Sequence, residues 1–166
     1  NLIILSRADP IICGHSTETR NLAAAACNLG VRNVHVVSYP LDVLASSGLP
    51  LKPENSVEAY SPGITVDRPA PIGDYKVLDG RLGAAISGHL INLLAKLPGK
   101  TAVMDLYLVP HGQMVMQAVE SCSRSGISSA PVTIGEAVGS DITNVVSNAL
   151  ATCQSGAAAL VMQNYL

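Results

Sequence analysis

The sequence predicts an α/β domain whose strands form one open parallel sheet. Short apolar segments alternate with longer segments of helical periodicity along most of the 166 residues. The first apolar segment, residues 2–5, is uninterrupted, as expected for a central strand that is buried on both faces. Strand-then-helix order favours parallel pairing, because each helix returns the chain to the start of the next strand. These observations predict a Rossmann-like sheet with helices on both faces.

A helix is expected to follow the first strand. Ser16 is suited to cap it, and Glu18 would lie in its first turn, where the helix dipole favours a negative charge. Gly30 has the position of a residue that ends a helix. The residues expected on the apolar face of this helix are Leu22, Ala25, Ala26 and Leu29.

The remaining elements are predicted in order along the chain. A strand over 34–38 is followed by a proline-rich irregular segment over 39–74, in which residues 63–66 are expected to form an edge strand. Leucines at helical spacing predict a long helix over 75–97. A strand over 101–104, a helix over 113–125 that ends at Gly126, and a strand over 131–134 come next. Ser140 or Asp141 is expected to cap a final helix.

The composition argues against nucleic-acid-binding and membrane-spanning proteins. Hydrophobic residues make up 48% of the chain and charged residues 13%, the net charge is -2, and Phe and Trp are absent. Because lysines and arginines form no cluster, we expect no nucleic-acid partner, and no apolar run is long enough for a membrane span. The four widely spaced cysteines show no metal-ligand spacing and are expected to be free thiols in the cytoplasm.

The length favours a single domain over residues 1–166, and it is compatible with an oligomer. Because Asn1 is not a translational start, we expect the chain to be a piece of a larger protein.

Candidate binding residues follow the strands, because ligands of open parallel sheets bind beyond the carboxyl ends of the strands. His15 and His111 are expected to contact substrate, although a packing or backbone-bonding role would explain each equally simply. His35 and His89 are interpreted as structural. The loop charges Arg7, Asp9, Arg20 and Asp105 are interpreted as solvated, with pairing among them as the alternative. The substrate-binding residues predicted from these loops are Gly14, His15, Tyr107, His111, Glu136 and Asp141, with Asp141 also a candidate helix cap.

The loop over 13–18 fits no nucleotide-binding motif, since Gly14 is its only glycine. Residues Gly14 to Glu18 resemble the start of a G-x-S-x-G nucleophile elbow, but Glu18 takes the place of the final glycine. Ser16 is therefore interpreted as a helix cap, with a serine nucleophile as the alternative.

The order of several short motifs resembles the N-terminal domain of GT-B fold glycosyltransferases of the retaining sucrose-phosphate-synthase and glycogen-synthase type. Similar features are the Gly-His loop before residues 21–25 and the Leu-Gly-x-x-x-Val entry into the strand at 34. The segments 78–82, 101–105 and 128–134 with 139–141 also correspond in order. That family often has a histidine after its last strand, where this chain has Glu136. Glu136 would replace it, or the acceptor differs.

The resemblance implies a function for the domain. It would be one half of a GT-B fold and bind a sugar or polyol acceptor, while a C-terminal domain outside these residues would bind the nucleotide-sugar donor. No cofactor or metal is then expected in this domain, and the domain alone would not catalyse transfer. Two alternatives remain open: a non-catalytic Rossmann-like ligand-binding or assembly module, and a serine hydrolase that uses Ser16.

Overall fold

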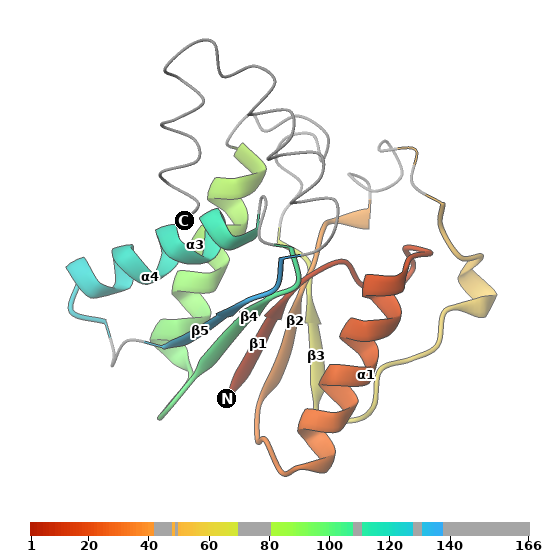
Figure 1. The fold of residues 1–166 in the computed structure, drawn as a ribbon, viewed down its shortest axis with the longest axis horizontal. Coiled ribbons are helices and arrows are strands. Elements are labelled where there is room, and N and C mark those ends of the chain that lie inside the picture. The colour runs from red at the N-terminus through yellow and green to blue at the C-terminus, as the bar shows by residue number, and fades with distance from the viewer. Residues whose placement is uncertain (42–47, 49, 70–80, 108–110, 128–130, 138–166) are drawn as a thin grey trace.

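The computed structural model describes residues 1–41, 48, 50–69, 81–107, 111–127 and 131–137. In this part of the chain five parallel strands form one sheet in the order β3-β2-β1-β4-β5 (Figure 1). The structure confirms the predicted Rossmann-like open parallel sheet, including the edge position of β3. The strands are β1 Leu2–Leu5, β2 Val34–Val37, β3 Ile64–Asp67, β4 Ala102–Asp105 and β5 Val132–Gly135.

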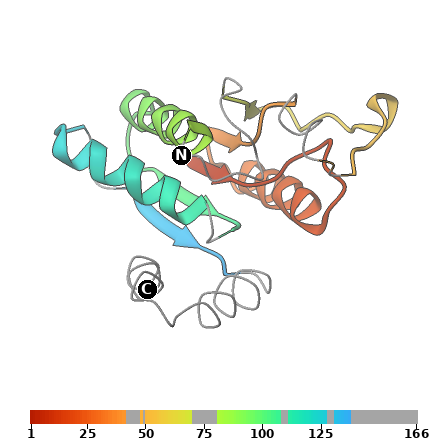
Figure 2. The same ribbon diagram turned by 90° about the horizontal axis from the view of Figure 1, so that it is seen from above.

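Helices cover both faces of the sheet, as predicted. Helix α1, Gly14–Asn28, joins β1 to β2 on one face. Helices α3, Arg81–Lys96, and α4, Gln113–Arg124, pack against each other on the opposite face (Figure 2). The described part of the connection from β2 to β3 contains the 3₁₀ helix η1, Glu54–Ser56, and agrees with the predicted irregular segment. The predicted helix that begins at Ser140 or Asp141 lies outside the described residues.

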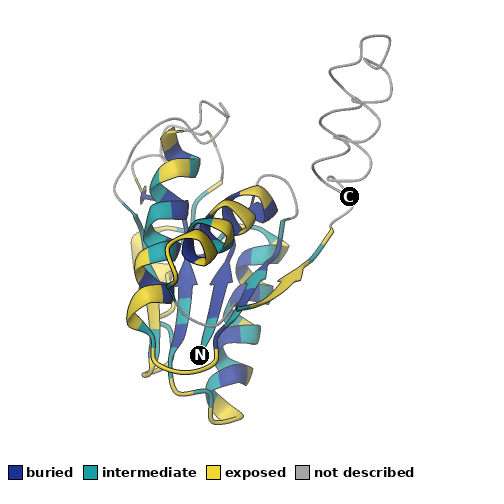
Figure 3. Ribbon diagram, turned by 90° about the vertical axis from the view of Figure 1, so that its left-hand side faces the viewer, coloured by how far each residue is buried: buried dark blue, intermediate teal, exposed yellow. Residues whose placement is uncertain are grey.

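The core is aliphatic and divided by the sheet into two layers. Ile3 and Leu5 of β1 point to the α3 and α4 side, whereas Ile4 between them points to the α1 side. Ile86 and Leu90 of α3 are fully buried in the first layer. Figure 3 shows the central strands buried and β5 exposed at the edge of the sheet. The second layer contains Ile4, Ala8, Ala23, Ala26, Val34, Val36 and Leu106.

Helix α1 differs from the prediction at its start and on its buried face. It begins at Gly14 with Cys13 as the N-cap residue, so Ser16 lies inside the helix and does not cap it. The predicted place of Glu18 in the first turn is wrong for the same reason. Leu29 is the C-cap residue of α1 and is 85% exposed. The residues that α1 buries are Ser16, Thr19, Ala23 and Ala26; Ala25 is exposed, and Leu22 is only partly buried.

Two helices end as the sequence predicts, at a glycine. Gly30 after α1 has a φ of 84°, and its N–H donates to the carbonyl of Cys27 at 2.9 Å. The N–H of Val31 donates to the carbonyl of Ala26 at 3.0 Å, which completes a Schellman motif. Gly126 after α4 has a φ of 64° and ends that helix in the same way. A left-handed residue is required at both positions, so glycine avoids the strain that a Cβ would add.

Candidate functional site

The candidate site lies at the carboxyl ends of the central strands. Leu5, Val37 and Asp105 end β1, β2 and β4, and the register places them level with one another. The chain leaves β1 toward β2 on one side, while β4 lies on the other side of β1. Loops diverge at such a reversal of strand order, and ligands of open α/β sheets bind in the resulting crevice.

Four aromatic side chains meet at this edge, and we call them the Tyr–His cluster: His15 from the first turn of α1, Tyr39 from the segment after β2, and Tyr107 and His111 from the connection between β4 and α4. The ring centroids of His15 and Tyr107 are 4.3 Å apart. Those of Tyr107 and His111 are 5.6 Å apart in an edge-to-face arrangement at 80°. The hydroxyl of Tyr39 is hydrogen-bonded to Nε2 of His111. The structure therefore brings together three predicted site residues and adds Tyr39.

His111 forms the buried base of the cluster, at 1% exposure. Burial, together with the nearby Arg7 and His15, lowers the pKa of His111 from 6.5 to about 3, although the backbone of Leu5 acts in the opposite direction. His111 is therefore neutral near neutral pH. It precedes α4 in a π-helical turn over 111–112, a local widening of the helix that is frequent at functional sites.

The upper rim of the cluster is accessible. His15, Tyr107 and Arg7 are partly exposed, whereas Tyr39 is 2% exposed. The guanidinium carbon of Arg7 lies 4.7 Å from the centroid of the Tyr107 ring, within the range of a cation–π interaction. Thr19 of α1 supports this loop, since its hydroxyl donates to the Arg7 carbonyl at 3.0 Å. A ligand at the rim would meet an aromatic face, an imidazole and a guanidinium.

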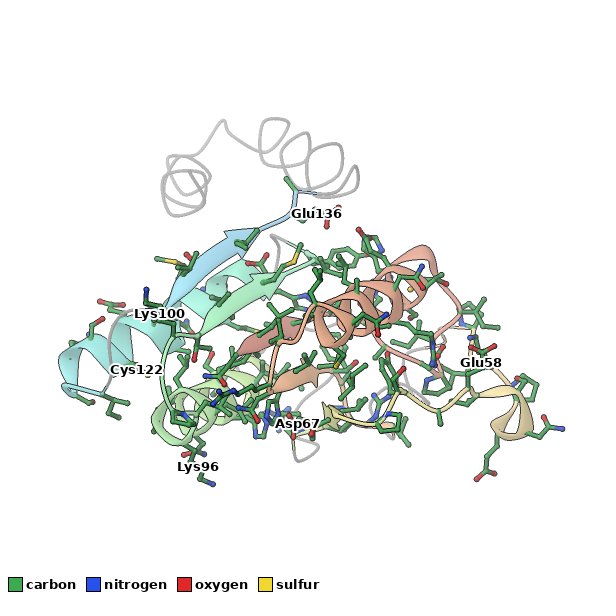
Figure 4. The ribbon with its side chains drawn as sticks, turned by 90° about the horizontal axis from the view of Figure 1, so that it is seen from below. Glu58, Asp67, Lys96, Lys100, Cys122 and Glu136 are labelled. Atoms are coloured by element: carbon green, nitrogen blue, oxygen red, sulfur yellow. The ribbon has the colours of Figure 1, made fainter. Side chains whose placement is uncertain are left out.

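The other predicted site residues lie in different surroundings. Gly14 is exposed at the start of α1, and a Cβ built there meets no atom within 4 Å, so the space above it is open. The backbone of Glu136 is fixed by its N–H, which donates to the Asp105 carbonyl at 2.9 Å. Among the described residues, no recorded interaction joins the Glu136 side chain to the cluster. Figure 4 shows Glu136 and Asp67 at opposite edges of the sheet. Asp141 lies outside the described residues.

Ser16 is 2% exposed, and its hydroxyl lies 3.3 Å from Sγ of Cys13. In the described part of the chain this contact replaces the hydrogen bond to a histidine that a serine nucleophile needs.

The structure gives His35 and His89 a shared partner. Nδ1 of His35 lies 2.7 Å from the Asp67 carboxylate, and Nε2 of His89 lies 3.6 Å from its other oxygen. These contacts tie β2, β3 and α3 together, which agrees with the structural interpretation of both histidines. Among the residues that the structure describes, no group of three potential metal ligands has the geometry to hold an ion.

The prediction of solvated loop charges is wrong for Asp9 and Asp105, whereas the alternative that these charges pair with one another is confirmed for Asp9 and Arg20. Asp9 is 4% exposed and pairs with Arg20, and Asp105 is 3% exposed at the end of β4. Asp9 is enclosed in the loop after β1 by its partners Arg20 and Lys52, and Asp105 ends a strand in the interior of the sheet.

Sequence reasoning missed Tyr39 and Arg7 as members of the site. Tyr39 is one of five tyrosines in the chain and lies two residues beyond the end of β2, so its position past a strand end was a usable signal. Its contact with His111 depends on the order of the strands, which the sequence does not state.

Within the described part of the chain, no helix combines the length and hydropathy needed to cross a bilayer. None of the protein-family models, curated proteins and solved structures compared with the chain matches it.

Proposed function

We propose that this domain binds the hydroxyl-bearing acceptor, a sugar or a polyol, of a glycosyltransferase. The observation that carries the proposal is the meeting of His15, Tyr107 and His111 at the carboxyl ends of β1 and β4. Sites for small polar ligands in α/β sheets combine an apolar face with a few convergent polar groups at this place. The motif order that resembles GT-B fold glycosyltransferases supports the same reaction class.

Each rim group has a part in acceptor binding. The Tyr107 ring offers a flat surface for the carbon–hydrogen face of a sugar. The guanidinium of Arg7 holds the ring in place through its cation–π contact. His15 can donate to or accept from an acceptor hydroxyl, since an imidazole has one nitrogen of each kind when neutral. His111 lies below and positions Tyr107 by edge-to-face packing. The base of the site is thereby fixed before the acceptor arrives, which lowers the entropic cost of binding.

In this proposal the acceptor oxygen forms the new glycosidic bond while the nucleoside diphosphate leaves with the bonding electrons, and the hydroxyl proton is released. A diphosphate leaving group needs several Arg or Lys side chains beside a glycine-rich turn as hydrogen-bond donors. Among the described residues, the Tyr–His cluster has no such group of donors. The proposal therefore assigns the nucleotide sugar to a second domain, as in the family that the sequence resembles.

Transfer assays test this division of labour. We expect the 166-residue chain to transfer no sugar from any nucleotide sugar, and a protein that joins it to its donor domain to do so. In the joined protein, Tyr107→Ala should raise the KM for the acceptor about tenfold through the loss of ring contacts, whereas Tyr107→Phe should change it little. Turnover by the 166-residue chain alone would contradict the proposal.

A further inference from the structure

A second hollow, of about 380 Å³, lies beside the loop that follows β1 and is separate from the Tyr–His cluster. Its volume is in the lower part of the range of pockets that hold small ligands, roughly 300–1,000 Å³. The described residues that line it are Asp9, Pro10, Leu41, Leu51, Lys52, Glu54, Val57 and Arg68. None of them belongs to the predicted acceptor site.

The carboxylate of Asp9 is already neutralised by two cations. One oxygen pairs with Arg20, and the other lies 2.9 Å from Nζ of Lys52. Burial alone would raise the pKa of Asp9, but the hydrogen bonds and charges of Arg20 and Lys52 outweigh it, so its pKa is lowered. Arg20 is held further by the carbonyls of Glu58 and Ala59 and by the ring of Tyr60. The Asp9 carboxylate thus has two cationic partners, of which Lys52 lines the hollow and Arg20 does not.

Arg68 supplies the additional positive charge. Its guanidinium donates to the carbonyl of Tyr39 at 2.7 Å and to the carbonyl of Asp9. Within the described part of the chain, no carboxylate forms an ion pair with Arg68. Burial lowers the pKa of Arg68, with Tyr60 and Asp9 acting in the opposite direction, so the cation is partly desolvated. A partly buried arginine whose hydrogen bonds go to neutral carbonyls is a good partner for an incoming anion.

The hollow is also lined by apolar side chains. These are Pro10, Leu41, Leu51 and Val57, of which Leu41 is 52% exposed and Val57 38% exposed. Glu54 also lines the hollow, but it is solvent-exposed, so its repulsion of an anion is screened. A lining that combines cations with apolar side chains fits a ligand that has both an anionic group and an apolar part.

We propose that this hollow binds a small organic anion, with a carboxylate or phosphate group on Arg68 and Lys52 and a compact apolar body against Leu41 and Val57. The proposal stands independently of glycosyl transfer, because it uses no residue of the Tyr–His cluster. The two sites are connected through Tyr39, whose carbonyl accepts from Arg68 and whose hydroxyl is bonded to His111.

Calorimetric titration of the 166-residue chain tests the charge requirement. Phenyl phosphate and benzoate are the anionic probes, and benzyl alcohol is the neutral probe of similar size. At low salt we expect at least one anion to bind and benzyl alcohol not to bind. The ratio of the two anionic affinities then shows whether the phosphate or the carboxylate is the better ligand.

Lys52→Gln is the decisive variant. It removes one charge-assisted hydrogen bond to the ligand, so affinity should fall about tenfold or more. Asp9 keeps Arg20 in this variant, and Lys52 is 32% exposed, so the fold should hold. Lys100→Gln is the matched control and should leave the affinity unchanged. Lys100 is exposed before β4, at the amino ends of the strands, and lies far from Glu58 in Figure 4.

Two further variants test the anionic group and the apolar body of the ligand separately. Arg68→Gln should abolish binding, and circular dichroism shows whether the variant is folded; Lys52→Gln decides the question if it is not. Leu41→Ser should weaken phenyl phosphate binding severalfold and leave inorganic phosphate unaffected. The proposal is overturned if neither anion binds the native chain at millimolar concentration, or if Lys52→Gln binds as tightly as the native chain. Loss of sugar binding at the Tyr–His cluster would not affect it.

Discussion

Acidification from about pH 7 to about pH 5 is expected to weaken the fold through His111. The side chain is buried at 1% exposure, and its pKa in the folded chain is about 3, compared with 6.5 for a free histidine. Above pH 6.5 the imidazole is neutral in both states and contributes no pH dependence. Below that value the unfolded chain takes up the proton and the folded chain does not, so falling pH favours unfolding.

The magnitude follows from the width of this window. Each pH unit between 6.5 and about 3 costs about 1.4 kcal/mol of unfolding free energy. Over the roughly 1.5 units down to pH 5 the loss is about 2 kcal/mol, a substantial share of the roughly 5–15 kcal/mol that stabilises an ordinary domain.

Urea unfolding followed by circular dichroism at both pH values measures this loss. His111→Gln removes the titrating group but keeps an amide that can bond to the Tyr39 hydroxyl. The native chain should lose about 2 kcal/mol more than this variant on acidification. His89→Gln is the control, because it removes a histidine elsewhere and leaves the effect of His111 in place. Equal losses in the native chain and His111→Gln would refute the reasoning.

Three other changes should alter stability in defined directions, each measured by urea unfolding. Tyr39→Phe removes the hydroxyl bonded to His111 and should cost about 1–3 kcal/mol, because a buried ring nitrogen loses its partner; no change would mean that the hydrogen bond is not formed. Gly30→Ala places a Cβ at a φ of 84° and should cost about 1 kcal/mol, whereas Gly88→Ala inside α3, where a Cβ meets no atom within 4 Å, should stabilise by about 0.5–1 kcal/mol; the opposite order would contradict the helix-end assignment. Asp9→Asn leaves two cations without a carboxylate and should cost about 3–5 kcal/mol near neutral pH; a neutral effect would show that the ion pairs are not formed in solution.

The sheet could be predicted because its signals are local. Residues 2–5 are uniformly apolar, and 34–37 are mostly β-branched, so burial on both faces follows from a few neighbouring side chains. The ends at Gly30 and Gly126 were predictable for the same reason. The start of α1 was not. Ser16 is a better cap by propensity than Cys13, but the chain turns into the helix at Gly14, and tertiary packing places Ser16 inside.

The sequence could predict which loops form the candidate site, but not which of their side chains meet. His15, Tyr107 and His111 follow strand ends, and parallel strands bring such ends to one edge. Which side chains touch depends on the order of β2, β1 and β4 and on burial of the loops. For that reason Tyr39 and Arg7 were missed, and the sequence did not decide whether Asp9 is solvated or paired with another loop charge.

Side-chain NMR of the histidines during titration with neutral sugars and polyols tests the central claim most directly. We expect at least one such ligand to shift the ring signals of His15, which lies at the rim, and to leave those of His35 beside Asp67 unchanged. Tyr107→Ala should weaken the effect, and nucleoside diphosphates should shift the His15 signals less than the sugar does. Unchanged His15 signals across the whole series, or larger shifts of His15 with the diphosphates, would contradict acceptor binding at the Tyr–His cluster.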